Sequence, residues 1–297
     1  MKVGYVGSAF SSINCKPDRS FKLKSYSREK LYSIVESNLQ CILQTLHFNL
    51  KYKIKFYRIA DFIPFATHPI SLPLESILQD FSPLIKKIAL FIQKNELRIV
   101  MHPGQYIVLN SPKNDVVEIA IKELEYDTKF MDLMNLNKEA KVQVHIGGIY
   151  GNKEKAIERF MRNFHLLPEN IQSRLAIEND DVSYTLYDCL LINQETGIPV
   201  IFDVFHHSIK NRGETLIEGI KRSIQTWKDH DGKLIVDWSS QEPEMKTGRH
   251  ADTLNEIEFQ NFINHTMEYD FDIMLEVRDK EKSAIKAVQI LEKYGRI

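Results

Sequence analysis

Histidine and acidic residues recur at the ends of short apolar segments in this chain, and this recurrence limits the folds it can adopt. The segments are RIVMH with His102, VQVH with His145, LAIEND with Glu178, VIFDVFHH with Asp203 and His206, and IMLEVRD with Glu276. Ligand-type side chains at the same end of successive parallel strands converge, and a parallel β-barrel carries its active site at the carboxyl ends of its strands. The pattern therefore predicts a barrel that holds divalent metal at its mouth.

β-Branched segments alternate with amphipathic segments along the chain, which is typical of repeated βα units. We expect strands at 2–7, 52–60, 97–102, 141–146, 174–178, 198–204, 233–238 and 271–277, and helices at 28–49, 74–95, 115–135, 153–166, 183–195, 214–228, 254–268 and 281–294. Eight such units predict an α/β fold with a single (β/α)8 TIM-barrel domain over residues 1–297. An open doubly wound sheet is the alternative, but no GxGxxG motif follows the first strand.

The composition of the chain limits the partners and the cellular compartment that we expect for such a domain. A net charge of −1 gives no global positive field, although a local basic rim could still attract a polyanion. The cysteines Cys15, Cys41 and Cys189 are odd in number and lack a CxxC motif, which favours a reduced, cytoplasmic setting. No apolar segment is long enough to span a membrane, and no signal-peptide core is visible at the start.

Nine side chains are candidate metal ligands because they fall at or just after the predicted strands. They are His68, His102, His145, Glu178, Asp203, His206, Asp237, His250 and Glu276. Imidazole and carboxylate together suit Zn, Mn or Fe, whereas carboxylates alone would suit Mg or Ca. A single histidine at a strand end is more often an ordinary hydrogen-bonded polar residue. Their joint occurrence on seven successive units favours the metal centre.

The segment MHPGQY places a polar and an aromatic side chain just after one candidate ligand. Gly104 permits a tight turn that projects Gln105 and Tyr106 beyond the rim, where they could replace the pairing and stacking of a displaced base. An ordinary exposed loop aromatic is the alternative. Basic residues also collect in the loops expected at the mouth, which favours a polyanionic substrate. These are Lys16, Arg19, Lys22, Lys24, Arg28, Lys30, Lys113, Lys153, Lys155, Lys210, Arg212, Lys246 and Arg249.

Taken together, the motifs GYVG, YRI, FATHP, MHPGQY, VHIGG, IEND, FDVFHH, GRHAD and LEVRDKE resemble those of the UV damage endonucleases over nearly the whole chain. These are barrel enzymes of the endonuclease IV-like and xylose isomerase-like superfamily. The resemblance implies a nick in duplex DNA immediately 5′ of a UV photoproduct, leaving a 3′-hydroxyl. It implies metal ligands at His68, His102, His145, Glu178, Asp203, His206, His250 and Glu276. It also implies lesion probing by Gln105 and Tyr106, with Tyr5 near the lesion.

The chain departs from that family pattern in its seventh strand. A Lys-x-His sequence is typical there, whereas this chain has Ile235, Val236 and Asp237, so we expect an aspartate in place of a histidine ligand. RIAD likewise stands where Arg-Ile-Ser-Ser is usual. Metal preference and the range of damage accepted depend on these changes.

We therefore expect a metal-dependent DNA repair endonuclease that flips the damaged nucleotides out of duplex DNA. Two or three divalent ions are expected, with Mn first and Zn, Co or Mg as alternatives. Glu178 and Glu276 are the expected catalytic residues, and Tyr5, Gln105, Tyr106, Lys113 and Arg249 are the expected DNA contacts. Neither a membrane nor an obligate protein partner is expected. The alternatives are a sugar isomerase or epimerase on the same barrel, and a damage sensor that does not cut.

Overall fold

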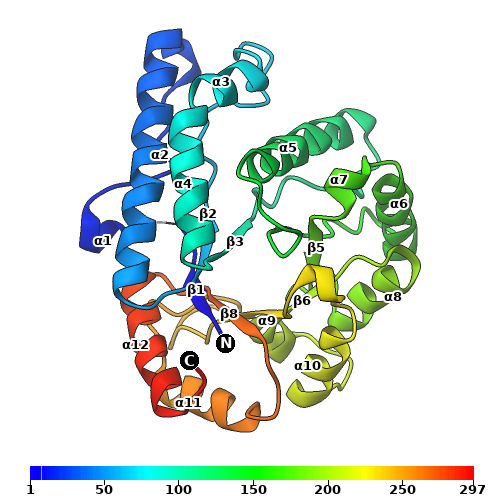
Figure 1. Cartoon of the computed structure of the whole chain (residues 1–297). Coiled ribbons are helices and arrows are strands. Elements are labelled where there is room, and N and C mark those ends of the chain that lie inside the picture. The colour runs from blue at the N-terminus through cyan, green and yellow to red at the C-terminus, as the bar shows by residue number, and fades with distance from the viewer. Residues whose placement is uncertain (8) are drawn as a thin grey trace.

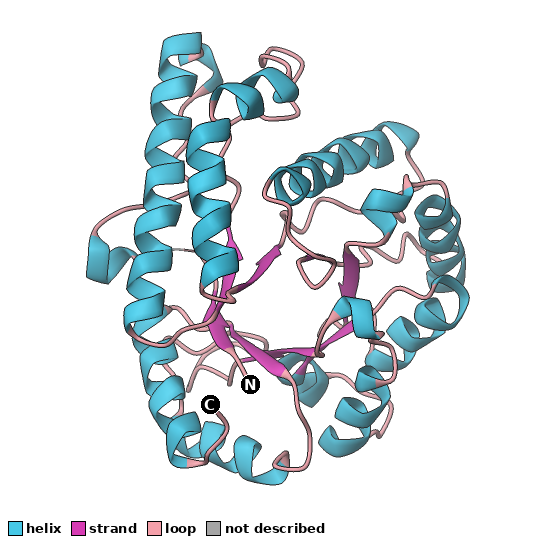
Figure 2. Cartoon of the chain, viewed as in Figure 1, coloured by secondary structure: helices cyan, strands magenta, loops and turns pink. Residues whose placement is uncertain are grey.

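The computed structural model describes residues 1–7 and 9–297, in which eight parallel strands form the centre of the molecule (Figure 2). The strands are β1 (Val3–Tyr5), β2 (Phe56–Ile59), β3 (Arg98–Met101), β4 (Lys141–Val144), β5 (Leu175–Glu178), β6 (Val200–Asp203), β7 (Ile235–Trp238) and β8 (Asp272–Leu275). Each predicted strand is confirmed, although the observed strands are shorter. Their order in the sheet is β1-β8-β7-β6-β5-β4-β3-β2, which leaves β1 and β2 at the two ends.

The two end strands meet and close the barrel. Val6 bridges Arg58 in parallel, and the Gly7 amide donates to the Arg58 carbonyl at 3.3 Å. Gly4 makes this approach possible, since a Cβ at that position would lie only 2.4 Å from the Phe56 carbonyl oxygen. The closed barrel confirms the predicted TIM-barrel fold and excludes the open doubly wound sheet.

Helices surround the strands, and the chain colour in Figure 1 advances around this ring. The longer helices are α2 (Arg28–Lys51), α4 (Ser82–Lys94), α5 (Asn114–Leu133), α6 (Lys153–His165), α8 (Leu186–Thr196), α10 (Leu216–Ile224), α11 (Glu256–His265) and α12 (Glu281–Lys293). The shorter ones are α1 (Phe10–Ile13), η1 (Leu23–Ser25), α3 (Leu74–Asp80), α7 (Glu169–Gln172), α9 (Val204–Ile209) and η2 (Asp229–Asp231).

The single helix predicted over 74–95 is divided into α3 and α4 at Phe81. Pro83 lies in the first turn of α4, and a proline has no amide to continue the hydrogen bonds of a preceding helix. The short helix α9 was not predicted. It begins because Asp203 accepts a hydrogen bond from the His206 amide at 2.7 Å, which caps the helix directly after β6.

The barrel interior is layered, because alternate residues of each strand point inward. Its middle layer is a separate apolar cluster of Phe56, Val100, Ala176, Ile201, Ile235 and Met274. Below it, Arg98 pairs with Asp272 at 2.9 Å, and Lys141 pairs with Asp231 at 2.5 Å. Two residues further along the strands, the inward positions are polar and form the mouth of the barrel.

The cysteines differ from the expectation that all are reduced. Cys15, in the first loop, and Cys41, in α2, are joined by a disulfide, while Cys189 is buried and free. The missed pair is 26 residues apart in sequence and becomes adjacent only when the first loop folds back on α2. Within the described residues, no helix has both the length and the apolar character that crossing a bilayer requires.

Candidate metal centre

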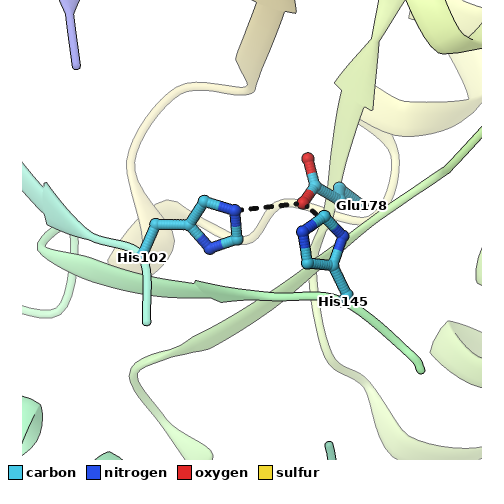
Figure 3. A group of neighbouring side chains, drawn as sticks. All are labelled: His102, His145 and Glu178. Carbon is cyan, nitrogen blue, oxygen red and sulfur yellow. Dashed lines mark ion pairs between the residues drawn. The ribbon is translucent and has the colours of Figure 1, made fainter. Parts of the chain in front are cut away.

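Three neighbouring strands bring a first group of ligand-type side chains together at the mouth. His102 follows β3, His145 follows β4, and Glu178 ends β5. His102 Nε2 lies 3.4 Å and His145 Nδ1 lies 2.9 Å from Glu178 Oε1, so both rings point at one carboxylate oxygen (Figure 3). One donor atom from each residue lies within 4.8 Å of the other two, a spacing that could hold a metal ion.

Backbone carbonyls fix the orientation of three histidine rings at this mouth. The Nδ1 atoms of His102, His206 and His250 lie 2.8, 3.1 and 2.9 Å from the carbonyl oxygens of Gln143, Asn179 and Glu276. Since a carbonyl can only accept, Nδ1 donates in each contact, and the neutral ring keeps its free lone pair on Nε2. Histidines that bind metal are commonly oriented in this way, with the second nitrogen available as the ligand.

The protonation of the first group follows from burial and the shared carboxylate. Burial lowers the pKa of His102 to about 4, so its ring is neutral at pH 7. The Glu178 carboxylate raises the pKa of His145 to about 9. Burial alone would raise the pKa of Glu178, but the imidazoles of His145 and His102 outweigh it and hold that pKa below its ordinary value. Without metal, His145 therefore carries the cation that balances Glu178.

A second group shares Glu178 and adds Asp203 and His206 from β6 and α9. Burial raises the pKa of Asp203 to about 7. Burial acts to lower the pKa of His206, but the nearby Asp203 carboxylate prevails and raises it to about 9. The His206 ring also lies edge-on to the ring of His250, with centroids 5.5 Å apart, so His250 borders this group.

A third group contains Asp203, Asp237 and Glu276, and a buried arginine stands among them. Arg58 Nη1 lies 2.5 Å from Glu276 Oε1, and Arg58 Nη2 lies 2.9 Å from Asp237 Oδ2. Gln143 joins the network, donating from Nε2 at 2.6 Å to Asp237 Oδ2 and accepting from Arg58 at 2.8 Å. Asp237 Oδ1 is buried and finds no hydrogen-bond partner among the described residues, so one oxygen remains for a ligand.

Arg58 and Gln143 are site residues that the sequence reasoning did not identify. Arg58 occupies an inward position of β2, and Gln143 occupies one of β4. The sequence does carry a signal for both residues. Each is a polar residue within a predicted strand, two positions from another inward residue. That signal does not mark a metal ligand, because neither a guanidinium nor an amide nitrogen binds cations.

Two predicted residues lie away from the cluster. His68 is exposed, its Nδ1 accepts from the Ile70 amide at 3.1 Å, and it belongs to none of the three ligand groups found among the described residues. Tyr5 is fully buried, and its hydroxyl donates to Asn49 in α2 at 2.7 Å. The alternation of β1 turns this ring toward α2, and contact of Tyr5 with a lesion stays a prediction.

The Gln105–Tyr106 loop separates two hollows at the mouth. Gln105 lines a hollow of about 630 Å³ together with the first metal-ligand group. Tyr106 lines a neighbouring hollow of about 500 Å³, and its side chain is 71% exposed. The side chains of Gln105 and Tyr106 are thus both available to a ligand that covers the mouth.

Among the predicted basic contacts, Lys113 is exposed at the start of α5, whereas Arg249 is paired with Asp252 at 3.3 Å.

The donor set fits divalent metal. Oriented imidazoles and the carboxylates of Glu178 and Glu276 line one hollow. Asp203 and Asp237 lie buried beside them, and the acids outnumber the cation of Arg58. Such acids stay ionised together only when cations balance them. The arrangement can bind a phosphate through metal and activate a water beside it.

Comparisons with known proteins place the chain in one family. The profile of the UV-endonuclease UvdE family matches residues 1–297. A UV DNA damage endonuclease of Clostridium perfringens strain 13 is 36% identical over 299 residues, covering 100% of this chain and 72% of the relative. A protein of the same name from Bacillus mycoides is 34% identical, covering 97% of this chain and 93% of the relative.

Solved structures give the same picture. The crystal structure of SacUVDE superposes over 100% of both chains with a TM-score of 0.94 and 44% identity. A D-psicose 3-epimerase from Clostridium cellulolyticum H10 superposes with a TM-score of 0.53 over 84% of this chain and 91% of that chain, at 12% identity. At that identity the epimerase shares the fold alone.

Proposed function

The chain belongs to the UV-endonuclease UvdE family, and we propose that it nicks duplex DNA immediately 5′ of UV photoproducts in a metal-dependent reaction. Family membership makes it a DNA repair endonuclease, a hydrolase. The observation that supports metal dependence is the grouping of His102, His145, Glu178, Asp203 and His206 at the mouth, in two sets that share Glu178 and whose donor atoms lie within 4.8 Å of one another.

We propose two or three divalent ions, with Mn preferred over Zn, Co or Mg. When bound, they would neutralise the phosphate and lower the pKa of an attacking water. His102, His145 and Glu178 would hold one ion, and Asp203, His206 and Glu178 another, with His250 beside them. Asp237 and Glu276 are the remaining candidates, through the oxygens that Arg58 and Gln143 leave free. His68 would have to turn inward to contribute.

The protein residues themselves position the substrate. Glu178 and Glu276 are the proposed catalytic carboxylates, since both line the mouth hollow and both are held by hydrogen bonds or ion pairs with neighbouring side chains. Arg58 is a positioning residue, because its ion pair with Glu276 fixes the orientation of that carboxylate. Gln105 and Tyr106 would fill the space left by flipped nucleotides, and damaged pairs cost less to open. Lys113 and Arg249 would contact the phosphate backbone.

The test is incision of a labelled duplex that carries one photoproduct, run beside the same duplex without damage. With Mn, we expect one nick directly 5′ of the lesion and a 3′-hydroxyl that a polymerase can extend. Removal of the metal with EDTA should abolish the nick. Equal cutting of both duplexes would overturn lesion specificity. Turnover of a ketohexose without nicking would instead favour the sugar isomerase or epimerase.

A further inference from the structure

A second tyrosine stands on the loop next to the Gln105–Tyr106 loop. Tyr106 follows His102 by four residues and Tyr150 follows His145 by five, and the two histidine rings lie 4.9 Å apart. The two loops therefore leave the barrel from neighbouring points of the rim. Tyr150 is 46% exposed and the adjacent Ile149 is 44% exposed, so an apolar tip faces solvent there.

Both tyrosine rings lie against a glycine of their own loop. A Cβ on Gly104 would come within 2.4 Å of the Tyr106 ring, and one on Gly148 would come within 3.2 Å of the Tyr150 ring. In each loop the missing side chain therefore provides the space for the ring. The guanidinium carbon of Arg159 lies 5.5 Å from the centroid of the Tyr150 ring, a cation–π distance.

The backbone of Tyr150 is held in a costly conformation. Its φ of 46° is in the left-handed region, which bulky side chains rarely adopt. Such conformations persist where surrounding contacts fix them, and they concentrate at ligand-binding sites. The contacts of this loop therefore have to offset that cost to keep the ring in its exposed position.

Hydrogen bonds tie the Tyr150 loop to the loop that carries Tyr106. Buried Asn110, which follows Tyr106 in the chain, donates to the Gly148 carbonyl at 2.8 Å, and Tyr184 donates to the same carbonyl at 3.0 Å. Arg159 Nε donates to the Asn110 carbonyl at 2.9 Å. The backbone at Gly148 is thus braced against the segment that follows Tyr106.

We infer that Tyr150, with Ile149 beside it, is a second base-stacking contact that grips an unpaired nucleobase of the opened duplex next to the Tyr106 site. The inference rests on the proposed damage-specific function. An exposed ring on a braced loop loses little entropy on stacking, and stacking accepts any base. The contact therefore adds affinity for opened DNA without reading its sequence.

The experiment compares Tyr150→Asn, Tyr150→Phe and Leu166→Asn in a Glu178→Gln background, so that the duplex stays intact. Asparagine tolerates the left-handed conformation, which keeps the loop folded. Leu166 is 75% exposed and lies at the far end of α6, so its variant controls for loss of an exposed apolar side chain. Kd is measured at fixed salt for duplexes with and without one photoproduct, with circular dichroism as the folding check.

Tyr150→Asn is expected to raise Kd for the damaged duplex by about 5- to 150-fold, the range for one base–aromatic stack, and to change Kd for the undamaged duplex much less. Tyr150→Phe and Leu166→Asn should bind as the parent does. Equal losses on both duplexes, or a Tyr150→Asn result like that of Leu166→Asn, would overturn the inference. If the Glu178→Gln parent and its Tyr106→Ala variant each gave the same Kd for the damaged and the undamaged duplex, the proposed function itself would fail.

Discussion

Arg58 Nη2 lies 2.9 Å from Asp237 Oδ2 inside the barrel, with 3% and 0% of the two side chains exposed. Asp237 stands on β7 where the family resemblance implied a histidine ligand. Burial would lower the pKa of Arg58, but Asp237 and Glu276 outweigh it and raise that pKa, so the guanidinium stays charged. The Asp237 carboxylate is thus paired with a fixed cation.

Arg58→Met should lower the free energy of unfolding by about 3–5 kcal/mol in the metal-free protein, because it leaves buried carboxylates unpaired. Chemical denaturation in EDTA measures this. The double variant Arg58→Met with Asp237→Leu should recover part of the loss, since it removes the stranded charge as well. Additive losses in the double variant would show that the pair is not coupled.

Glu178→Gln should abolish incision and leave the fold intact. Glu178 is common to the first two ligand groups, and a neutral amide cannot balance cations there as a carboxylate does. Metal content measured after dialysis should fall with activity, while the circular dichroism spectrum stays unchanged. Glu195→Gln, in α8, is the matched control. Incision at the parent rate would remove Glu178 from the mechanism.

Tyr106→Ala should weaken binding of a damaged duplex by roughly 1–3 kcal/mol, the scale of one base–aromatic stack. Binding of undamaged duplex should change much less, because phosphate contacts dominate it. Paired binding constants at fixed salt measure the difference. The same loss on both duplexes would mean that Tyr106 only supports its loop.

Stability of the metal-free protein should fall as pH rises from about 6.5 to 9. His145 and His206 have folded pKa values of about 9, above the ordinary imidazole value, so the folded state binds more protons in this window. Their contribution is complete below pH about 6.5 and is lost as pH passes through about 9. His102, with its pKa of about 4, acts in the opposite direction only at lower pH.

Denaturation at several pH values in EDTA and in saturating Mn checks this prediction. Metal should remove the slope, since it displaces the same protons. A metal-free stability that stays level or rises over this window would contradict the assigned imidazole environments.

The strands and the placement of most candidate ligands at the mouth were predictable because inward positions of a barrel repeat every second residue. Glu178 and Asp203 end their strands, and His102 and His145 follow theirs directly, so strand position alone placed them at the mouth. Residues after longer loops were harder. His68 lies nine residues beyond β2, where no periodicity fixes its direction, and the structure leaves it exposed.

Long-range partners could not be predicted from local pattern. The pairing of Arg58 with Asp237 joins residues 179 positions apart, and it depends on barrel closure bringing β2 opposite β7. The disulfide between Cys15 and Cys41 likewise depends on how one loop returns to one helix. Tyr5 was placed at the lesion by resemblance, but which face of a three-residue strand points outward is settled only by packing against α2.

The carboxylates at the mouth also make metal binding an exchange. Glu178 and Glu276 line the hollow that a phosphate must enter, Asp203 and Asp237 lie buried beside them, and Arg58 pairs with Asp237 and Glu276. Without metal, His145 and His206 hold protons that balance part of this charge. An ion that binds here has to displace those protons, so the centre should take up metal less readily as the pH falls.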